Sequence, residues 1–135
     1  MSQLLAAESV RPLRIFVVEN HADTLKYLLL YLEQLGHQVK SARSMTEALE
    51  RLPDADCDVL ISDIGLPDGD GWQLLEQTKF SYPVYAIAMS GFGMNADRVR
   101  SMAAGFRHHV LKPFVPEDLD AMLEEAAHEC ALRST

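Results

Sequence analysis

Short runs of apolar and β-branched residues alternate along this chain with longer stretches that have the apolar period of a helix. This alternation predicts successive βα units on a parallel sheet, because each helix packs back on the sheet through a right-handed crossover. The result is a single α/β domain of five βα units, doubly wound on a five-stranded parallel sheet. We expect its strands at residues 14–18, 38–42, 59–62, 84–89 and 108–111.

Five helices are expected between and after these strands. The first, at about residues 22–35, carries leucines at helical spacing and stops before Gly36, a favourable residue just beyond a helix end. The second starts at Ser44, which forms a capping-box pattern with Glu47, and ends near Pro53. The remaining helices are expected at about residues 71–80, 95–104 and 116–130.

Length, charge and cysteine content limit what the chain can do. Its 135 residues form one domain, which we place at residues 13–130 between a flexible leader at 1–12 and a short tail at 131–135. A formal net charge of −8 disfavours nucleic acid and anionic membranes as direct partners. No apolar run approaches the roughly 20 residues that a membrane span requires. Because Cys57 and Cys130 are too few for a disulfide framework, we expect a reduced, cytoplasmic protein.

Polar residues stand at the ends of four of the expected strands. They are Glu19 and Asn20, Asp63, Ser90, which Gly91 follows, and Lys112, which Pro113 follows. The carboxyl ends of parallel strands meet at one edge of the sheet, where such sheets bind ligands. Carboxylate and amide oxygens suit a hard cation such as Mg²⁺. A carboxylate can also receive a phosphoryl group whose oxygens are held by a metal, a lysine and a hydroxyl. The sequence therefore predicts phosphoryl chemistry at this edge.

Taken in order, these motifs resemble the receiver domain of two-component response regulators, of the chemotaxis-regulator type. They are Glu19-Asn20, the Asp63 of VLISDIGLPDGDGW, the Ser90-Gly91 of IAMSGF and the Lys112-Pro113-Phe114 of HHVLKPF. The similarity covers residues 13–130 and implies a flavodoxin-like sheet with strand order 2-1-3-4-5. It also implies a signalling module, not an enzyme, that takes part in a phosphorelay. Such a module accepts a phosphoryl group from a histidine kinase or a histidine phosphotransfer protein, with Mg²⁺ as cofactor.

The resemblance implies a role for each residue that would meet the phosphoryl group. Asp63 corresponds to the phosphoacceptor, Ser90 to the switch hydroxyl, and Lys112 to the lysine that pairs with the phosphoryl oxygen. Gly91 takes a position where a small residue keeps the site accessible. Pro113 takes the family's cis-proline position, and X–Pro is the bond type that readily tolerates cis.

Two positions depart from the family pattern. The metal ligands that the resemblance implies are Glu19, Asn20, Asp63 and the backbone carbonyl of Gly65. The family usually has aspartate at the position of Asn20, so one negative charge is missing and weaker Mg²⁺ binding is expected. His109 stands where the family commonly has Tyr or Phe, and we expect this ring to take two positions as part of the switch.

The expected output is a change of surface for a downstream protein or a second copy of the chain. In the family that surface is the fourth helix, the fifth strand and the fifth helix, which here includes Arg98, Arg100 and His109. Trp72 is expected to be a packing residue near the start of the third helix. The cognate kinase, the signal, the downstream target and the oligomeric state stay open, as does the choice between a stand-alone regulator and a fragment of a hybrid kinase.

Three other functions compete with a phosphorylated receiver domain. A pseudo-receiver that binds proteins without phosphorylation is the alternative, because Asn20 weakens the metal site. A phosphatase of the haloacid dehalogenase type needs a second acid two residues after Asp63, and that residue is Gly65. A flavodoxin-type cofactor site needs a hydroxyl- and glycine-rich loop after the first strand, where this chain places a carboxylate.

Overall fold

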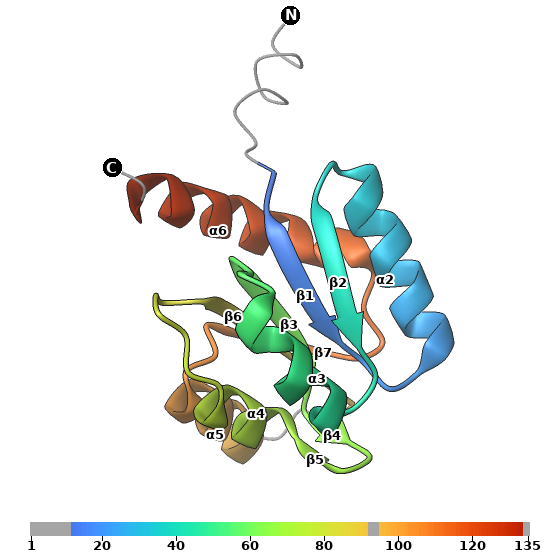
Figure 1. Cartoon of the computed structure of the whole chain (residues 1–135). Coiled ribbons are helices and arrows are strands. Elements are labelled where there is room, and N and C mark those ends of the chain that lie inside the picture. The colour runs from blue at the N-terminus through green and yellow to red at the C-terminus, as the bar shows by residue number, and fades with distance from the viewer. Residues whose placement is uncertain (1–11, 92–94, 134–135) are drawn as a thin grey trace, which may run out of the picture.

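The sheet predicted from the sequence is present in the structure, a computed structural model that describes residues 12–91 and 95–133 (Figure 1). Its order, β2-β1-β3-β6-β7, is the expected 2-1-3-4-5 order, and every pair is parallel. The flavodoxin-like, doubly wound fold is therefore confirmed. The strands are β1 (Arg14–Val18), β2 (Gln38–Ala42), β3 (Val59–Asp63), β6 (Tyr85–Ser90) and β7 (His108–Leu111).

Helices cover both faces of this sheet (Figure 1). Side chains of α2 and α6 pack on one face, and side chains of α3 and α4 pack on the other, beside α5. The helices are α2 (Ala22–Gln34), α3 (Met45–Arg51), α4 (Gly71–Gln77), α5 (Asn95–Ala104) and α6 (Asp120–Arg133), with 3₁₀ turns η1 (Leu52–Asp54) and η2 (Pro116–Leu119).

Two helices end or begin differently from the prediction. The third expected helix, 71–80, stops at Gln77, because Thr78 turns to extended backbone while its hydroxyl donates to the Leu74 carbonyl at 2.7 Å. The last one opens as the 3₁₀ turn η2 and continues as α6 to Arg133, three residues into the expected tail. Residues 1–11 of the expected leader and residues 134–135 lie outside the described residues.

The start of α3 and the end of α2 follow the sequence signals. Ser44 caps α3, since its hydroxyl accepts the Glu47 N–H at 3.1 Å. The Glu47 carboxylate in turn accepts the backbone N–H of Arg43 at 2.9 Å. After α2 the chain turns at Gly36, whose φ of +95° is in the region that favours glycine.

Alternating strand side chains build two apolar cores, one on each side of the sheet. In β1, Ile15 and Val17 face α2 and α6, while Phe16 and Val18 face α3 and α4. Every residue of β3 and β6 is buried, as is usual where helices cover both faces of a parallel sheet. These two central strands hold their carboxyl ends rigidly at one edge.

A short antiparallel hairpin follows β3 and was not expected. It joins β4 (Gly65–Leu66) to β5 (Gly69–Asp70). In its turn, Asp68 accepts the backbone N–H groups of Met45 at 2.7 Å and Thr46 at 2.8 Å. The hairpin is therefore fastened to the first turn of α3. Within the described ranges, none of the helices has the length and apolarity needed to cross a bilayer.

Candidate functional site

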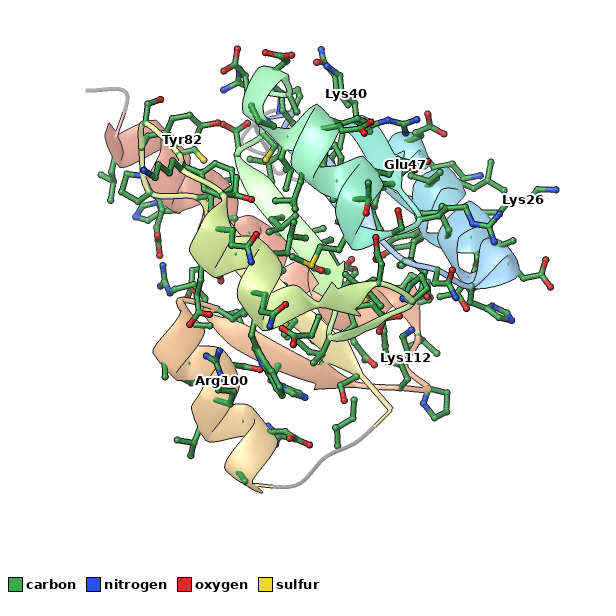
Figure 2. All side chains as sticks on the ribbon, turned by 60° about the horizontal axis from the view of Figure 1, so that its bottom comes forward. Lys26, Lys40, Glu47, Tyr82, Arg100 and Lys112 are labelled. Atoms are coloured by element: carbon green, nitrogen blue, oxygen red, sulfur yellow. The ribbon has the colours of Figure 1, made fainter. Side chains whose placement is uncertain are left out.

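Three of the predicted residues form one cluster at the carboxyl edge of the sheet. Figure 2 shows Lys112 beyond the end of β7. Its ammonium Nζ lies 2.5 Å from Glu19 Oε1, after β1, and 3.1 Å from Asp63 Oδ2, the last residue of β3. The fourth strand is tied in through its backbone, because the Lys112 N–H donates to the Ser90 carbonyl at 2.7 Å. Four strand ends thus converge, as the sequence predicted.

Burial makes this cluster electrostatically unusual. Glu19 is 1% exposed and Asp63 is 9% exposed, yet both are carboxylates and share one ammonium. Burial, followed by the Glu19 carboxylate, raises the pKa of Asp63 to about 7 against the lowering effect of Lys112. Burial lowers the pKa of Lys112, but both carboxylates outweigh it and raise that pKa overall. With both acids ionised, the cluster carries one net negative charge and favours a further cation.

The other predicted metal ligands adjoin this cluster along the chain, since Asn20 follows Glu19 and Gly65 is two residues after Asp63. Asn20 is exposed, and its backbone carbonyl accepts Arg43 Nη2 at 2.9 Å. Gly65 is exposed in β4, two residues after Asp63. The second oxygen of Glu19 accepts the backbone N–H of His21 at 3.0 Å, a contact that the sequence did not predict.

The donor set fits a hard cation. Two buried carboxylates, an amide and a backbone carbonyl are all oxygen donors, and Mg²⁺ commonly takes only one or two carboxylates and keeps several waters. In the described part of the chain, no three His, Cys, Asp or Glu side chains gather as a metal cluster.

Space lies beside two of the predicted site residues. Among the described atoms, leaving out its two chain neighbours, none lies within 4 Å of a Cβ added at Gly91. Beside Lys112 lies a cavity of about 530 Å³ between α2 and the segment after β7. The cavity is lined by Asp23, Thr24, Tyr27, Leu28, Lys112, Pro113, Phe114 and Pro116.

The Lys112–Pro113 peptide bond is cis, in agreement with the expectation for Pro113.

His109 was predicted to belong to the output face and to be a switch ring that takes two positions. In the structure its ring is only 6% exposed. In β7 the side chains alternate, so Val110 packs in the core with α2 and α6 while His109 points toward α5. There its Nδ1 lies 2.8 Å from the hydroxyl of Ser101 in α5. The register of β7, which the sequence does not reveal, places His109 and not His108 on this inward face, and the predicted second position of the ring stays a prediction.

Ser101 and Trp72 complete this buried contact. The Trp72 Nε1–H donates to Ser101 Oγ at 2.9 Å, in addition to the packing role expected for Trp72. Ser101 was missed because one serine among polar and small residues of a helix carries no periodic signal. A serine on the inward face of a predicted helix is the signal that could have found it.

The fold and this edge define a class of protein, the doubly wound signalling module with an acid pair around a lysine at the carboxyl ends of its strands. The family profile described as the response regulator receiver domain matches residues 15–124. The chain belongs to this family, the receiver domains of two-component systems. Receiver domains of this kind work with histidine kinases, and phosphorylation on aspartate and Mg²⁺ binding are general properties of the family.

Curated relatives and solved structures agree. The virulence transcriptional regulatory protein PhoP of Salmonella typhimurium is 34% identical over 116 residues, which are 83% of this chain and 50% of the relative. The two-component response regulator PhoP of Pseudomonas aeruginosa is 32% identical over 114 residues, with 82% and 50% covered. The chain spans about half the length of these curated relatives. A CheY-like receiver domain from Methanospirillum hungatei JF-1 superposes with a TM-score of 0.81 at 28% identity, covering 88% of this chain and 96% of that one.

Proposed function

We propose that this chain is a phosphoacceptor that takes a phosphoryl group onto Asp63 from the phosphohistidine of a histidine kinase or a histidine phosphotransfer protein. The observation that carries the proposal is the buried Asp63 carboxylate, 3.1 Å from Lys112 Nζ and beside Glu19. A carboxylate held against a second carboxylate and away from water is more basic than an ordinary one. That increases its nucleophilicity at the cost of its stability as an anion.

In the transfer, the bond from an Asp63 oxygen to phosphorus forms as the bond from phosphorus to the donor imidazole nitrogen breaks. The electron pair of the broken bond returns to the imidazole. Lys112 is placed to hold a phosphoryl oxygen, because its ammonium already contacts Asp63 Oδ2. Glu19 stays on the other side of that ammonium and orients it. Neither residue needs to leave the edge for the group to enter.

We assign Glu19, Asn20, Asp63 and the backbone carbonyl of Gly65 as the groups that would hold Mg²⁺. When bound, Mg²⁺ supplies positive charge that offsets the charges of the carboxylates and the phosphoryl group. The net negative charge of the cluster around Lys112 supports this assignment.

The response to phosphorylation is assigned to the neighbouring strand ends. Ser90 is buried at the end of β6, one strand away from Asp63, and would donate its hydroxyl to a phosphoryl oxygen. Gly91 leaves room for the group to enter, and Pro113 shapes the turn behind Lys112. Through His109 the change would reach α5. The module assists only its own phosphorylation and dephosphorylation and is not otherwise an enzyme.

A pseudo-receiver is the second candidate, and a specific observation favours it. Asn20 is neutral, and both oxygens of Glu19 already accept hydrogen bonds, from Lys112 and from His21. If these contacts outweigh metal binding, the domain binds partners without phosphorylation. Comparing Mg²⁺ affinity in the wild type and in Asn20→Asp separates the two candidates.

The proposed output face is α5, β7 and α6, for a downstream protein or for self-association. Val99 is 67% exposed and Met102 is 47% exposed on α5, and Leu111 is 38% exposed on β7. Molecular mass in solution, measured with and without phosphorylation, tests self-association, and an unchanged monomer contradicts it. We place the exchange in the cytoplasm, since two cysteines, Cys57 and Cys130, are too few for a disulfide framework.

The proposed function is tested by intact mass after incubation with Mg²⁺ and acetyl phosphate. The wild type should gain the mass of one phosphoryl group only when Mg²⁺ is present. Asp63→Asn should gain none, while Asp56→Asn, at an exposed aspartate, should behave as the wild type. A wild type that gains no mass even at high Mg²⁺ would contradict the proposal and favour the pseudo-receiver.

A further inference from the structure

Three hydrogen-bonded side chains, Trp72, Ser101 and His109, form a polar series between the sheet and two helices. Trp72 in α4 donates its Nε1–H to Ser101 Oγ in α5 at 2.9 Å, and Ser101 Oγ lies 2.8 Å from His109 Nδ1 in β7. Ser101 is 0% exposed and His109 is 6% exposed. Polar groups buried in an apolar core are costly unless they are hydrogen-bonded, so breaking one link disturbs the others.

His109, at one end of this polar series, lies on the strand next to β6, and β6 lies next to the strand that carries Asp63. In the described sheet β7 is an edge strand that pairs only with β6, so it is held on one side. His109 pairs in register with Ala88. Ser90 lies two residues further along β6, on the same face as Ala88. A displacement of Ser90 or of β7, the strand that leads to Lys112, would therefore move the surroundings of His109.

Trp72, at the other end of this polar series, reaches the surface between α4 and α5. The Arg100 guanidinium, labelled in Figure 2, stacks over the Trp72 ring at 5.2 Å from its centre. Arg100 also binds Glu76 of α4 through two hydrogen bonds of 3.0 Å. A shift of Trp72 would therefore move Arg100 and Glu76, which α5 and α4 present at the surface.

We propose that Ser101 is a positioning residue that couples the His109 ring to Trp72, so that the state of the edge around Asp63 is read out on the α4–α5 surface. The inference rests on the proposed function, because it takes phosphorylation of Asp63 as the event that is read out. The Ser101 hydroxyl can make both links at once, since its oxygen accepts from the indole while its hydrogen is available for Nδ1. Alanine has nearly the same shape but lacks both links.

The coupling is tested first in the unmodified protein. Trp72 is the only tryptophan of the chain, so intrinsic fluorescence reports on this position alone. His109→Phe keeps a ring but removes Nδ1, and it should shift the emission of Trp72 in the wild-type background. In the Ser101→Ala background the same change should produce no shift. An equal shift in both backgrounds would overturn the coupling.

Two further variants guard against damage to the fold. His109→Asn keeps a polar atom near the position of Nδ1 and should retain the wild-type emission. Ser81→Ala removes a hydroxyl at an exposed position and should change nothing. If His109→Asn shifts the emission as far as His109→Phe does, the ring acts through packing alone and the proposal fails.

The second test adds Mg²⁺ and acetyl phosphate, with mass and fluorescence recorded on the same samples. The wild type should gain one phosphoryl group and change its emission. Ser101→Ala should gain the same mass and lose the emission change, whereas Ser101→Thr should restore it. An undiminished change in Ser101→Ala would overturn the proposal. A wild type without added mass would contradict the proposed function instead, and the comparison in unmodified protein still decides the coupling.

Discussion

The ionised carboxylate of Asp63 destabilises the folded state, and its effect on the free energy of unfolding can be measured. Its pKa of about 7 lies about 3 pH units above the ordinary value of 3.8. Because each pH unit corresponds to about 1.4 kcal/mol, ionised Asp63 costs the folded state up to about 4 kcal/mol. Asp63→Asn keeps the shape of the side chain and removes the charge, while Lys112 keeps its contact with Glu19. We expect it to raise the free energy of unfolding by about 2 to 4 kcal/mol at pH 8.

The pH dependence has a definite sign. The folded-state pKa of Asp63 is raised, so between pH 4 and pH 7 the unfolded chain loses the proton first and the folded state binds more protons. The stability of the wild type should therefore fall, relative to Asp63→Asn, as the pH rises through this window and level off above it. Near pH 4 the two proteins should be almost equally stable.

Urea unfolding at pH 4, 6 and 8, with a chelator present, measures this difference. Asp58→Asn is the matched control, because Asp58 is also a buried carboxylate but accepts the Arg14 backbone N–H at 2.9 Å and its guanidinium at 3.0 Å. Removing that charge should destabilise the protein by about 1 to 3 kcal/mol. The reasoning is refuted if Asp63→Asn is no more stable than the wild type at pH 8, or if their difference does not change with pH.

Three further predictions concern other parts of the chain. Asn20→Asp adds a carboxylate to the proposed metal site and should tighten Mg²⁺ binding about tenfold, or about 1.4 kcal/mol, in a titration. Burial lowers the pKa of His37, whose Nδ1 accepts the Leu13 N–H at 3.0 Å, so stability should fall as the pH drops below about 6.5. His37→Asn should flatten that fall in urea unfolding. Asp68→Ala frees the first N–H groups of α3 that Asp68 binds, and it should lower the urea midpoint without changing the slope.

Each of these has a result that would contradict it. An unchanged Mg²⁺ affinity in Asn20→Asp would show that residue 20 does not contribute to the metal site. If His37→Asn and the wild type lose stability in parallel between pH 7 and pH 5, His37 is not the group that titrates. If Asp68→Ala unfolds at the wild-type midpoint, the bond between the hairpin and α3 contributes nothing to stability.

The three inner strands, β1, β3 and β6, were predictable because nearly all of their residues are buried and they read as short apolar runs. Three of the five have the predicted bounds, and β3 and β6 differ only at their ends, where Asp63 and Ser90 are the last strand residues. The helix predicted to reach residue 80 was too long, because the backbone of Thr78 turns to an extended conformation. The hairpin at residues 65–70 was missed, since strands of two residues rich in glycine carry no alternation.

The site was predictable as a set of strand ends but not as a set of contacts. The sequence identified Glu19, Asp63 and Lys112, and the structure brings these three together. It assigned His109 to the switch, but whether His108 or His109 faces the core depends on the pairing of β7 with β6. The link from His109 to Ser101 depends on how α5 packs on the sheet, which no local pattern encodes.

The central claim, that Asp63 is the phosphoacceptor, is tested most directly by locating the phosphoryl group. Borohydride reduces an acyl phosphate on aspartate to homoserine, which changes the mass of the peptide that carries it. After treatment with Mg²⁺ and acetyl phosphate, we predict homoserine at residue 63 and unmodified aspartate elsewhere. Homoserine at another aspartate, or unreduced Asp63 in protein that has gained a phosphoryl mass, would contradict the account.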